Sequence, residues 1–600
     1  MKKGKWKFLS LLIVLGLLLS ACSSGTSGKK SEGQEGQGSE PELVDPSSFP
    51  KTVVNEETEI DGGSLTYALV SDTAFEGILD YAFYESSPDA EVISFFAEPI
   101  FAYDANYQIT NDGESAAKFE MSEDGKTMTV TIQDGVTWHD GEPLKAEDYA
   151  FSFEIIGHPD YTGVRYGDAL ISGIVGMEDY HNGKADTISG IKILNDKQLT
   201  ITWEEANPSL LSGIWSYAEP KHHFEGIEIG DLASSDKIHT DLLGFGPFKV
   251  TNIVPGESVE YEAYENYYGG APKLDSVVLK VVSPTTIGEA IKKGDVDIAS
   301  FPTDQYDKDY VPTNFQYLAD MDAAYTYIGF KLGHWDAEAG VAVQDKDTPL
   351  QDVKLRQAIG YAMDNKSVAE RFYQGLRVPA TTLMIPFFAD FHNPDIEGYS
   401  YNTEKANQLL DEAGYKDVDG DGYREDLEGN EMVFNFASMS GGETAEPLAN
   451  FYIQNWKDVG IHVQLLEGRL HEMNSFYDRV EGDDEAVDIY QGAWGTGTDP
   501  DPYGLWSKLA PYNYPRFVND KNEELLAAGH SEDAFDQEFR KDIYDQWQQL
   551  MVDEAPVIPT LYRYYLMAVN NRVKNYSIEA GSELGWEDVA VTAEKAFVEE

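Results

Sequence analysis

Residues 129–154 read TVTIQDGVTWHDGEPLKAEDYAFSFE and combine several structural signals in one short stretch. From residue 126 to residue 132, apolar side chains alternate with threonines, which predicts a strand with one buried face. Asp134-Gly135 marks the turn that follows this strand. Residues 142–156 then read as a second turn and a helix. The stretch therefore predicts a strand, a turn and a helix in close succession.

Other stretches repeat these two patterns along the chain. Residues 64–70 form a strand candidate that begins after two glycines, and residues 486–494 read as another strand. Apolar residues at helical spacing predict a helix over residues 352–364, with Asp352 placed to cap it. The same spacing predicts a helix within residues 401–415, ended by Gly414.

Taken in order, these stretches resemble the peptide/nickel-type solute-binding proteins that serve ABC importers. The pieces that carry the resemblance are residues 129–154, 244–250, 266–282, 352–364 and 401–415. Gln133 stands where the family usually has a basic residue, and Tyr149 where it usually has valine. In such proteins, residues like Trp138, His139 and Asp140 are mainly structural.

The resemblance implies an α/β fold, namely the two-lobed periplasmic-binding-protein fold of the large peptide-binding class. This class has two lobes, an additional domain and a hinge of two crossing strands, which are expected near residues 325–330 and 556–562. Ligand binds between the lobes, which close around it. The implied parts are lobe I (51–87, 219–324 and 563–600), an additional domain packed on lobe I (88–218), and lobe II (325–562).

The N-terminus predicts export and a lipid anchor. Residues 1–22 have a lysine-rich head, an apolar run too short to span a bilayer, and small residues before Cys22. Leu19-Ser20-Ala21-Cys22 resembles the lipobox of bacterial lipoproteins, in which the cysteine is acylated and becomes the first mature residue. Cys22 is the only cysteine among 600 residues. Residues 23–50 are rich in Ser, Gly, Glu, Gln and Lys and predict a flexible tether.

Composition narrows the class of function. The formal charge is −62, and loss of the four lysines in residues 1–22 takes it to −66, a field that repels nucleic acid and anionic lipid headgroups. About 550 residues of body exceed what one hydrophobic core normally serves, so two or more lobes are expected. The expected location is the outer face of the cell membrane, with a Gram-positive cell favoured.

The ligand site is expected at the end of the strand over residues 486–494. In peptide-binding relatives a tryptophan stands there, and a nearby aspartate pairs with the amino terminus of the peptide. Trp494 matches the tryptophan, but Gly497 stands where the aspartate usually lies. The candidate binding residues are therefore Trp494, Gly495, Thr496, Gly497, Asp499 and Asp501, with Phe75 and Gly77 as a second wall. The alternative is a Gly/Pro turn beside a core tryptophan.

Residues 417–428 fit the pattern D-x-D-x-D-G-x5-E of a calcium loop. The expected ligands are carboxylates of Asp417, Asp419, Asp421 and Glu428 and the backbone carbonyl of Tyr423. Such an ion would be structural, and no cofactor is required for binding. The alternative is an acidic turn without metal.

Enzyme motifs are missing from the sequence. With Cys22 acylated there is no thiol nucleophile, and His471-Glu472 lacks the second histidine of a zinc-protease helix. No G-x-S-x-G elbow and no phosphate loop occur. The chain is thus expected to be a monomeric oligopeptide receptor that delivers peptides to the transmembrane subunits of an ABC permease. The alternatives are a receptor for one signalling peptide, a binding protein for an oligosaccharide or metal chelate, or a secreted hydrolase.

Overall fold

The structure is a computed structural model and describes residues 44–167, 169–441 and 444–599. The predicted signal segment, Cys22 and most of the predicted tether lie outside these residues. The end of that tether is folded onto the body. Pro46–Ser48 form a 3-10 helix, and the Phe49 ring packs edge-on at 5.9 Å from Tyr306. The folded body therefore begins before Pro50, where the sequence predicts the tether to end.

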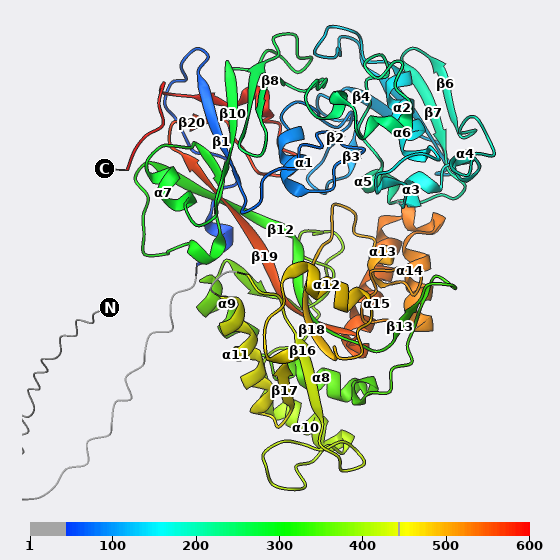
Figure 1. The fold of residues 1–600 in the computed structure, drawn as a ribbon, viewed down its shortest axis with the longest axis vertical. Helices are drawn as coiled ribbons and strands as arrows, with labels where there is room; N and C mark the ends of the chain where they lie inside the picture. The colour runs from blue at the N-terminus through cyan, green and yellow to red at the C-terminus, as the bar shows by residue number, and fades with distance from the viewer. Residues whose placement is uncertain (1–43, 168, 442–443, 600) are drawn as a thin grey trace, which may run out of the picture. The chain divides into compact units, whose positions relative to one another are not determined.

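Two long antiparallel strands, β12 (Phe315–Phe330) and β19 (Val557–Asn570), run through the middle of the body (Figure 1). They lie in an eleven-stranded sheet ordered β17-β16-β18-β12-β19-β11-β1-β10-β9-β8, with β15 (Arg377–Pro379) paired to β19. One end of the pair joins the strands of lobe I, and the other end joins those of lobe II. These are the two crossing strands predicted near residues 325–330 and 556–562.

Lobe I is built on the end of the sheet that contains β1. Its elements are β1 (Ser64–Val70), α1 (Ser87–Ile93), β8 (Phe248–Val254), β9 (Ser258–Ala263), β10 (Ser276–Val282), α7 (Ile287–Lys292) and β11 (Ile298–Ser300). A buried ion pair ties this lobe together, because Arg572 Nε and Nη2 donate to the two oxygens of Asp297, both at 2.7 Å. The Thr66 amide also donates to Asp297 at 2.8 Å, so the buried carboxylate has the hydrogen bonds that its burial requires.

Lobe II surrounds the other end of the sheet. Its elements include α8 (Val353–Tyr361), α9 (Asn365–Tyr373), α10 (Thr403–Ala413), β16 (Val433–Ala437), α11 (Ala445–Lys457), β17 (His462–Leu465), α12 (Met473–Glu481), β18 (Ile489–Gly495), α13 (Tyr503–Trp506), α14 (Asp520–Gly529) and α15 (Gln537–Glu554). The predicted cap is present, since the Lys354 amide donates to Asp352 Oδ1 at 2.9 Å. Gly414 ends α10 in the left-handed region, with φ +98°. Both predicted helices are confirmed.

The additional domain has a sheet and a core of its own. The sheet has the order β4 (Ala117–Met121), β5 (Thr127–Ile132), β7 (Gln198–Thr202), β6 (Ile191–Asn195), and it packs on α2 (Ala146–Gly157). Every second residue of β5 is buried, as the alternation predicts. Trp138 Nε1 donates to Asp148 Oδ2 at 3.3 Å, and His139 Nε2 is 2.9 Å from the Gly246 carbonyl oxygen. Both side chains therefore hold turns in place, as expected.

The boundaries of this domain differ from the predicted range 88–218. Its buried core extends to Phe245 and includes Ala82 and Phe83. Val92 and Ile93 of α1 instead pack in the core of lobe I. A resemblance gives the order of the segments, whereas the packing of apolar side chains decides to which core each segment belongs.

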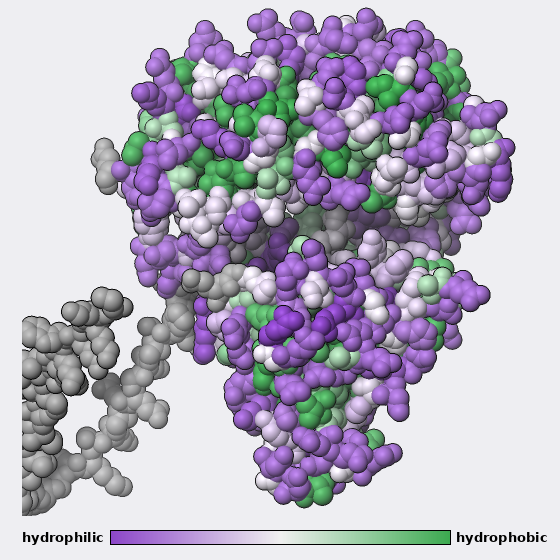
Figure 2. Space-filling model, in the orientation of Figure 1, coloured by the Kyte–Doolittle hydropathy of each residue, from purple (hydrophilic) through white to green (hydrophobic). Residues whose placement is uncertain are grey.

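The surface of the body is mostly hydrophilic on the face that Figure 2 draws. Figure 2 shows a largely hydrophilic face with scattered apolar residues and a recess between the upper and lower parts of the body. Within residues 44–599, leaving aside the three undescribed positions, no helix has the length and apolar character needed to cross a bilayer.

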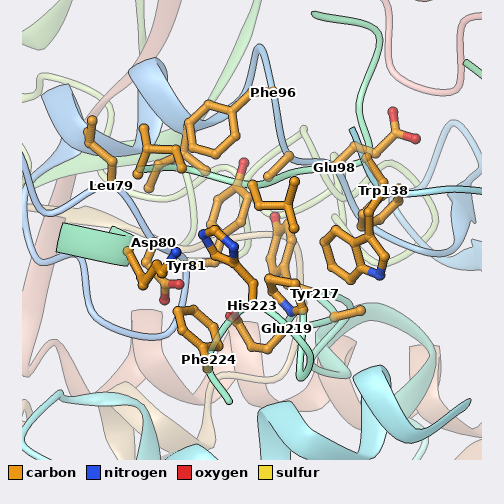
Figure 3. Close-up of a pocket in the computed structure, with 18 residues that line it drawn as sticks. Leu79, Asp80, Tyr81, Phe96, Glu98, Trp138, Tyr217, Glu219, His223 and Phe224 are labelled. Carbon is orange, nitrogen blue, oxygen red and sulfur yellow. The ribbon is translucent and has the colours of Figure 1, made fainter. Parts of the chain in front are cut away.

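A small internal cavity lies where lobe I meets the additional domain (Figure 3). Asp80, Glu98 and Glu219 line it, and its volume of about 30 Å³ has room for a water molecule or two, not for a ligand. Burial raises the pKa of Asp80 to about 6 and that of Glu98 to about 8. Burial and the Asp80 charge also raise the pKa of Glu219. The cavity therefore brings together three acidic side chains whose pKa values are all raised.

Because of this cluster, we predict that the folded protein becomes less stable as the pH rises. The folded-state pKa of Glu98, about 8, lies above its ordinary value of 4.5, so the folded protein retains a proton that the unfolded chain releases. The resulting stabilisation is complete below pH 4.5 and is lost as the pH rises through 8. We expect Glu98→Gln, which cannot ionise, to lose less thermal stability than the wild type between pH 5 and pH 8. Melting curves of Glu98→Gln and of the exposed control Glu120→Gln test this, and parallel pH dependence of Glu98→Gln and wild type would contradict it.

Candidate functional site

Two cavities lie on opposite faces of the sheet, beside the carboxyl-terminal half of β18. Tyr325 lines one cavity and Thr326 the other. Successive residues of a strand point to opposite faces, and Tyr325 and Thr326 pair with Trp494 and Ala493 of β18. The end of β18, which the sequence singles out, is therefore flanked by a cavity on each side.

The first of these, the acidic cavity, has a volume of about 270 Å³. It is lined by Tyr325, Leu383, Met384, Phe388, Gly495, Thr496, Asp499, Pro500, Asp501, Pro502, Gly504, Leu505, Trp506, Tyr512 and Trp547. Four of the predicted site residues, Gly495, Thr496, Asp499 and Asp501, are thus brought together. Apolar and aromatic walls around two carboxylates are typical of a pocket that binds a cationic group on a partly apolar ligand.

The two carboxylates of this cavity have different partners. Asp499 Oδ1 accepts from Ser212 Oγ at 3.1 Å and from the Asp501 amide at 3.2 Å, and lies 3.7 Å from Arg540 Nη2. Asp501 Oδ1 accepts from the Tyr503 amide at 2.9 Å, while Asp501 Oδ2 lies 3.5 Å from His530 Nδ1. Burial, together with the Asp501 charge, raises the pKa of Asp499 to about 6. Asp501 is consequently the carboxylate with fewer protein partners.

Trp494 and Gly497 lie beside the acidic cavity, and neither lines it. The half-buried Trp494 ring packs 5.7 Å from Tyr512 and 5.1 Å from Tyr514. Gly497 has φ +64° and open space around the position of a Cβ atom. An aspartate at this position would adopt a conformation that glycine favours, which is a physical reason for the departure from the family pattern.

Phe75 and Gly77 do not form a second wall of either cavity. Phe75 is 4% exposed and packs in the core of lobe I. The Gly77 amide donates to Asp89 Oδ1 at 2.8 Å, at a turn with φ +85°. Apolar packing draws the Phe75 side chain into the core, so it lines neither cavity.

Contacts between the additional domain and lobe II adjoin the acidic cavity. Arg540 Nη2 donates to Ser209 Oγ at 2.9 Å, and Thr498 Oγ1 donates to the Ser212 carbonyl oxygen at 3.2 Å. With the bond from Ser212 to Asp499, these contacts join the loop after β18 to the facing domain.

The second cavity, here called the Arg377 cavity, has a volume of about 450 Å³. It is lined by Pro302, Thr303, Asp304, Thr326, Tyr373, Arg377, Ser438, Met439, Gly441, Thr444, Ala445, Leu448, Gln491, Gly492 and Ala493. Residues 302–304 come from lobe I and the others from lobe II. No local sequence pattern marks this cavity, because its walls come from segments that lie far apart in the chain.

The acidic loop at residues 417–428 is assembled with one change from the predicted ligands. Carboxylate oxygens of Asp417, Asp419, Asp421 and Glu425 all lie within 4.8 Å of one another. The exposed Glu428 is not in this group, and its amide donates to Asp426 Oδ1 at 2.9 Å. Glu425 is 8% exposed, and it stands nine residues into the loop, a spacing that could have been found in the sequence.

Backbone groups shape this loop. Asp417 accepts from the Gly420 and Gly422 amides, at 2.6 and 3.1 Å, and Glu425 accepts from the Val418 amide at 2.6 Å. The Tyr423 amide donates to Asp421 Oδ1 at 2.8 Å. Four carboxylates at this separation repel one another, and oxygen ligands of this kind suit a calcium ion.

Comparison with known proteins agrees with this architecture. The sequence model of "Bacterial extracellular solute-binding proteins, family 5 Middle" matches residues 112–516. The oligopeptide-binding protein OppA of Lactococcus lactis subsp. lactis (strain IL1403) is 34% identical over 508 residues, covering 83% of this chain and 84% of the relative. The oligopeptide-binding protein AppA of Bacillus subtilis (strain 168) is 25% identical over 597 residues, covering 97% and 98% of the two chains.

Among solved structures, lactococcal OppA complexed with an endogenous peptide in the closed conformation is similar in fold. Its TM-score is 0.77 at 32% identity, and the match covers 88% of this chain and all of the other. The two-lobed α/β fold, the resemblance of the sequence and the family match agree. This chain belongs to family 5 of the bacterial extracellular solute-binding proteins.

Proposed function

We propose that the protein is a membrane-anchored receptor that captures oligopeptides between its two lobes and delivers them to an ABC permease. The acidic cavity carries the proposal, because it places two carboxylates and aromatic walls at the carboxyl end of β18, beside the contacts between the additional domain and lobe II. The similarity to lactococcal and Bacillus oligopeptide-binding proteins supports peptides as the ligand class. In this proposal the protein acts as a monomer and releases its ligand chemically unchanged.

The proposed mode of binding combines backbone pairing with recognition of the amino terminus. A peptide would lie as an extended strand along the chain that follows β18, which gives affinity with little dependence on sequence. Its terminal ammonium would approach Asp501 Oδ2, since Asp499 is already held by Ser212 and Arg540. Tyr512, which is 53% exposed, offers an aromatic surface to the side chains.

Removal of the Asp501 charge tests this mode. We expect Asp501→Asn to bind peptides with a free amino terminus roughly tenfold to a hundredfold more weakly, the usual range for a charge-assisted hydrogen bond. Peptides with an acetylated amino terminus should bind the variant and the wild type alike. Titration calorimetry with both peptide types measures the effect, and the exposed Asp478→Asn is the matched control. An equal loss for both types would show that Asp501 does not bind the amine.

We also propose that Cys22 is acylated and holds the protein at the outer face of the cell membrane. The basic head, the apolar run and the single cysteine of the sequence support this. Two acyl chains anchor a protein stably, because each buried methylene contributes about 0.8 kcal/mol.

The anchor is tested by Cys22→Ala expressed in a Gram-positive host. We expect the wild type in the membrane fraction, and the variant in the culture medium or retained as the uncleaved precursor. Mass spectrometry of the wild-type N-terminus should find a lipid on Cys22. Wild-type protein released without a lipid would contradict the proposal.

Finally, we propose that the loop at residues 417–425 holds a structural calcium ion. The four grouped carboxylates support it, and they replace the ligand set predicted with Glu428. Arg424 fastens the loop to its surroundings, since Nη1 donates to the Tyr415 carbonyl oxygen at 2.6 Å.

Calcium should raise the melting temperature of the protein. At a hundred times the dissociation constant, ligand binding stabilises a folded protein by about 2.7 kcal/mol. We expect Glu425→Gln and Asp419→Asn to lose this shift, whereas Glu428→Gln should keep it. A shift lost in Glu428→Gln and kept in Glu425→Gln would favour the predicted ligand set over the grouped one, and no shift in the wild type would exclude the ion.

A further inference from the structure

Arg377 stands out among the buried and half-buried arginines. In the described part of the chain its guanidinium has no hydrogen bond and no salt bridge, and it lies 3.9 Å over the Tyr373 ring. By contrast, the buried Arg572 pairs with Asp297, and the buried Arg516 pairs with Asp483 at 2.9 Å. Arg377 is half-buried, and a guanidinium partly withdrawn from water without a hydrogen-bond partner carries a free-energy cost, so its described surroundings leave the site incomplete as a purely structural element.

The residue paired with Arg377 in the sheet adds to the free-energy cost of this charge. In the pairing of β15 with β19, Arg377 faces Arg563, and like charges directly opposite each other destabilise a sheet. Arg563 is neutralised by Asp322 at 2.9 Å, whereas Arg377 has no ion-pair partner among the described residues. Burial, with the Arg563 charge in addition, lowers the pKa of Arg377.

Arg377 lines the Arg377 cavity together with groups that can accept or donate hydrogen bonds. Thr326, Ser438 and Gln491 line the same cavity from the sheet side. Asp304 is the one acidic residue among the described residues of the lining; it comes from lobe I and forms no ion pair with Arg377. The cavity has a volume of about 450 Å³ and both apolar and polar walls, and among its described residues Arg377 is the one cation without an ion-pair partner, which suits it to an anionic group of a ligand.

We propose that Arg377 is a specificity-determining residue that binds a carboxylate of the captured peptide. The inference rests on the proposed function and adds a second charged subsite to it. A guanidinium stacked on an aromatic ring keeps its planar edge free and can donate two parallel hydrogen bonds to a carboxylate. The carboxylate belongs either to the C-terminus of the peptide or to an Asp or Glu side chain, and the two sources share this chemistry.

A defined peptide pool distinguishes these sources. The pool contains alanine-based octapeptides in which each internal position in turn carries Glu or Gln, each sequence being made with a free and with an amidated C-terminus. Native mass spectrometry of the purified protein measures which peptides are retained. We expect the wild type to favour carboxylate-bearing peptides over their neutral counterparts by roughly tenfold to a hundredfold.

Two variants and one control complete the experiment. Arg377→Gln should lose the preference, while Arg377→Lys, which keeps the charge and loses the planar fork, should retain part of it. Arg371→Gln is the matched control, because Arg371 is an exposed arginine of α9 near the Phe451 ring. Melting curves verify that each variant is folded. If Arg377→Gln does not fold, the inference is judged from the carboxylate preference of the wild type compared with that of Arg377→Lys.

Each outcome has a defined meaning. If the retained peptides are those with a free C-terminus, the subsite binds the peptide end. If they are those that contain Glu, the subsite binds a side chain. Peptide binding without any preference for a carboxylate, or a preference unchanged in Arg377→Gln, would overturn this inference and leave the proposed function intact. Failure of the wild type to retain any peptide would overturn both.

Discussion

The pairing of β12 with β19 is the constraint on which the rest of the structure depends. Among the described residues, these two strands alone lead from the strands of one lobe to those of the other, and their register shifts between Met321 and Tyr325. Such an irregularity leaves residues of one strand unpaired and bends it locally. Tyr325 and Thr326 follow the irregular segment directly and line the acidic cavity and the Arg377 cavity. A change of angle between the lobes must therefore move the walls of both cavities.

Charge is distributed unevenly around this crossing. The chain carries 106 acidic residues against 44 basic ones, so a basic side chain generally finds an acidic partner. Asp322 and Arg563 form such a pair beside the irregular segment, at 2.9 Å. Arg377 stands next to that pair and has no ion-pair partner in the part of the chain that the structure describes, while Asp499 and Asp501 share the other face of the sheet. The two faces thus present opposite charges at the strand ends, a pattern that matches a zwitterionic ligand better than a neutral one.

Local patterns predicted much of the fold. Alternation located β5, helical spacing located α8 and α10 with their caps, and the resemblance placed the crossing strands. The sequence also indicated which residues meet at the end of β18, because one short loop contains Gly495, Thr496, Asp499 and Asp501. Local patterns failed where packing between distant segments decides the outcome. Phe75 is drawn into the core of lobe I, and residues up to Phe245 join the core of the additional domain.

The acidic loop shows the same effect of packing at a smaller scale. The choice of Glu428 followed a loop pattern, but a bridge between Lys416 and Glu425 turns Glu425 inward and leaves Glu428 in solvent. Arg377 carried no signal at all, because its isolation depends on which side chains surround it after folding. A sequence shows which charges are present, and only the packed structure shows which of them lack a partner.

In the proposed function, the contacts of Asp499 would connect the binding of a peptide amine with closure of the lobes. Burial and the Asp501 charge raise the pKa of Asp499 to about 6. An ammonium bound at Asp501 would offset that neighbouring negative charge and favour the ionised form of Asp499. An ionised carboxylate accepts a stronger hydrogen bond than a neutral one, and Asp499 accepts from Ser212 of the additional domain at 3.1 Å. Since a ligand shifts a conformational equilibrium only through its different affinity for the two states, this shared carboxylate gives a peptide amine a direct route to favour the closed state.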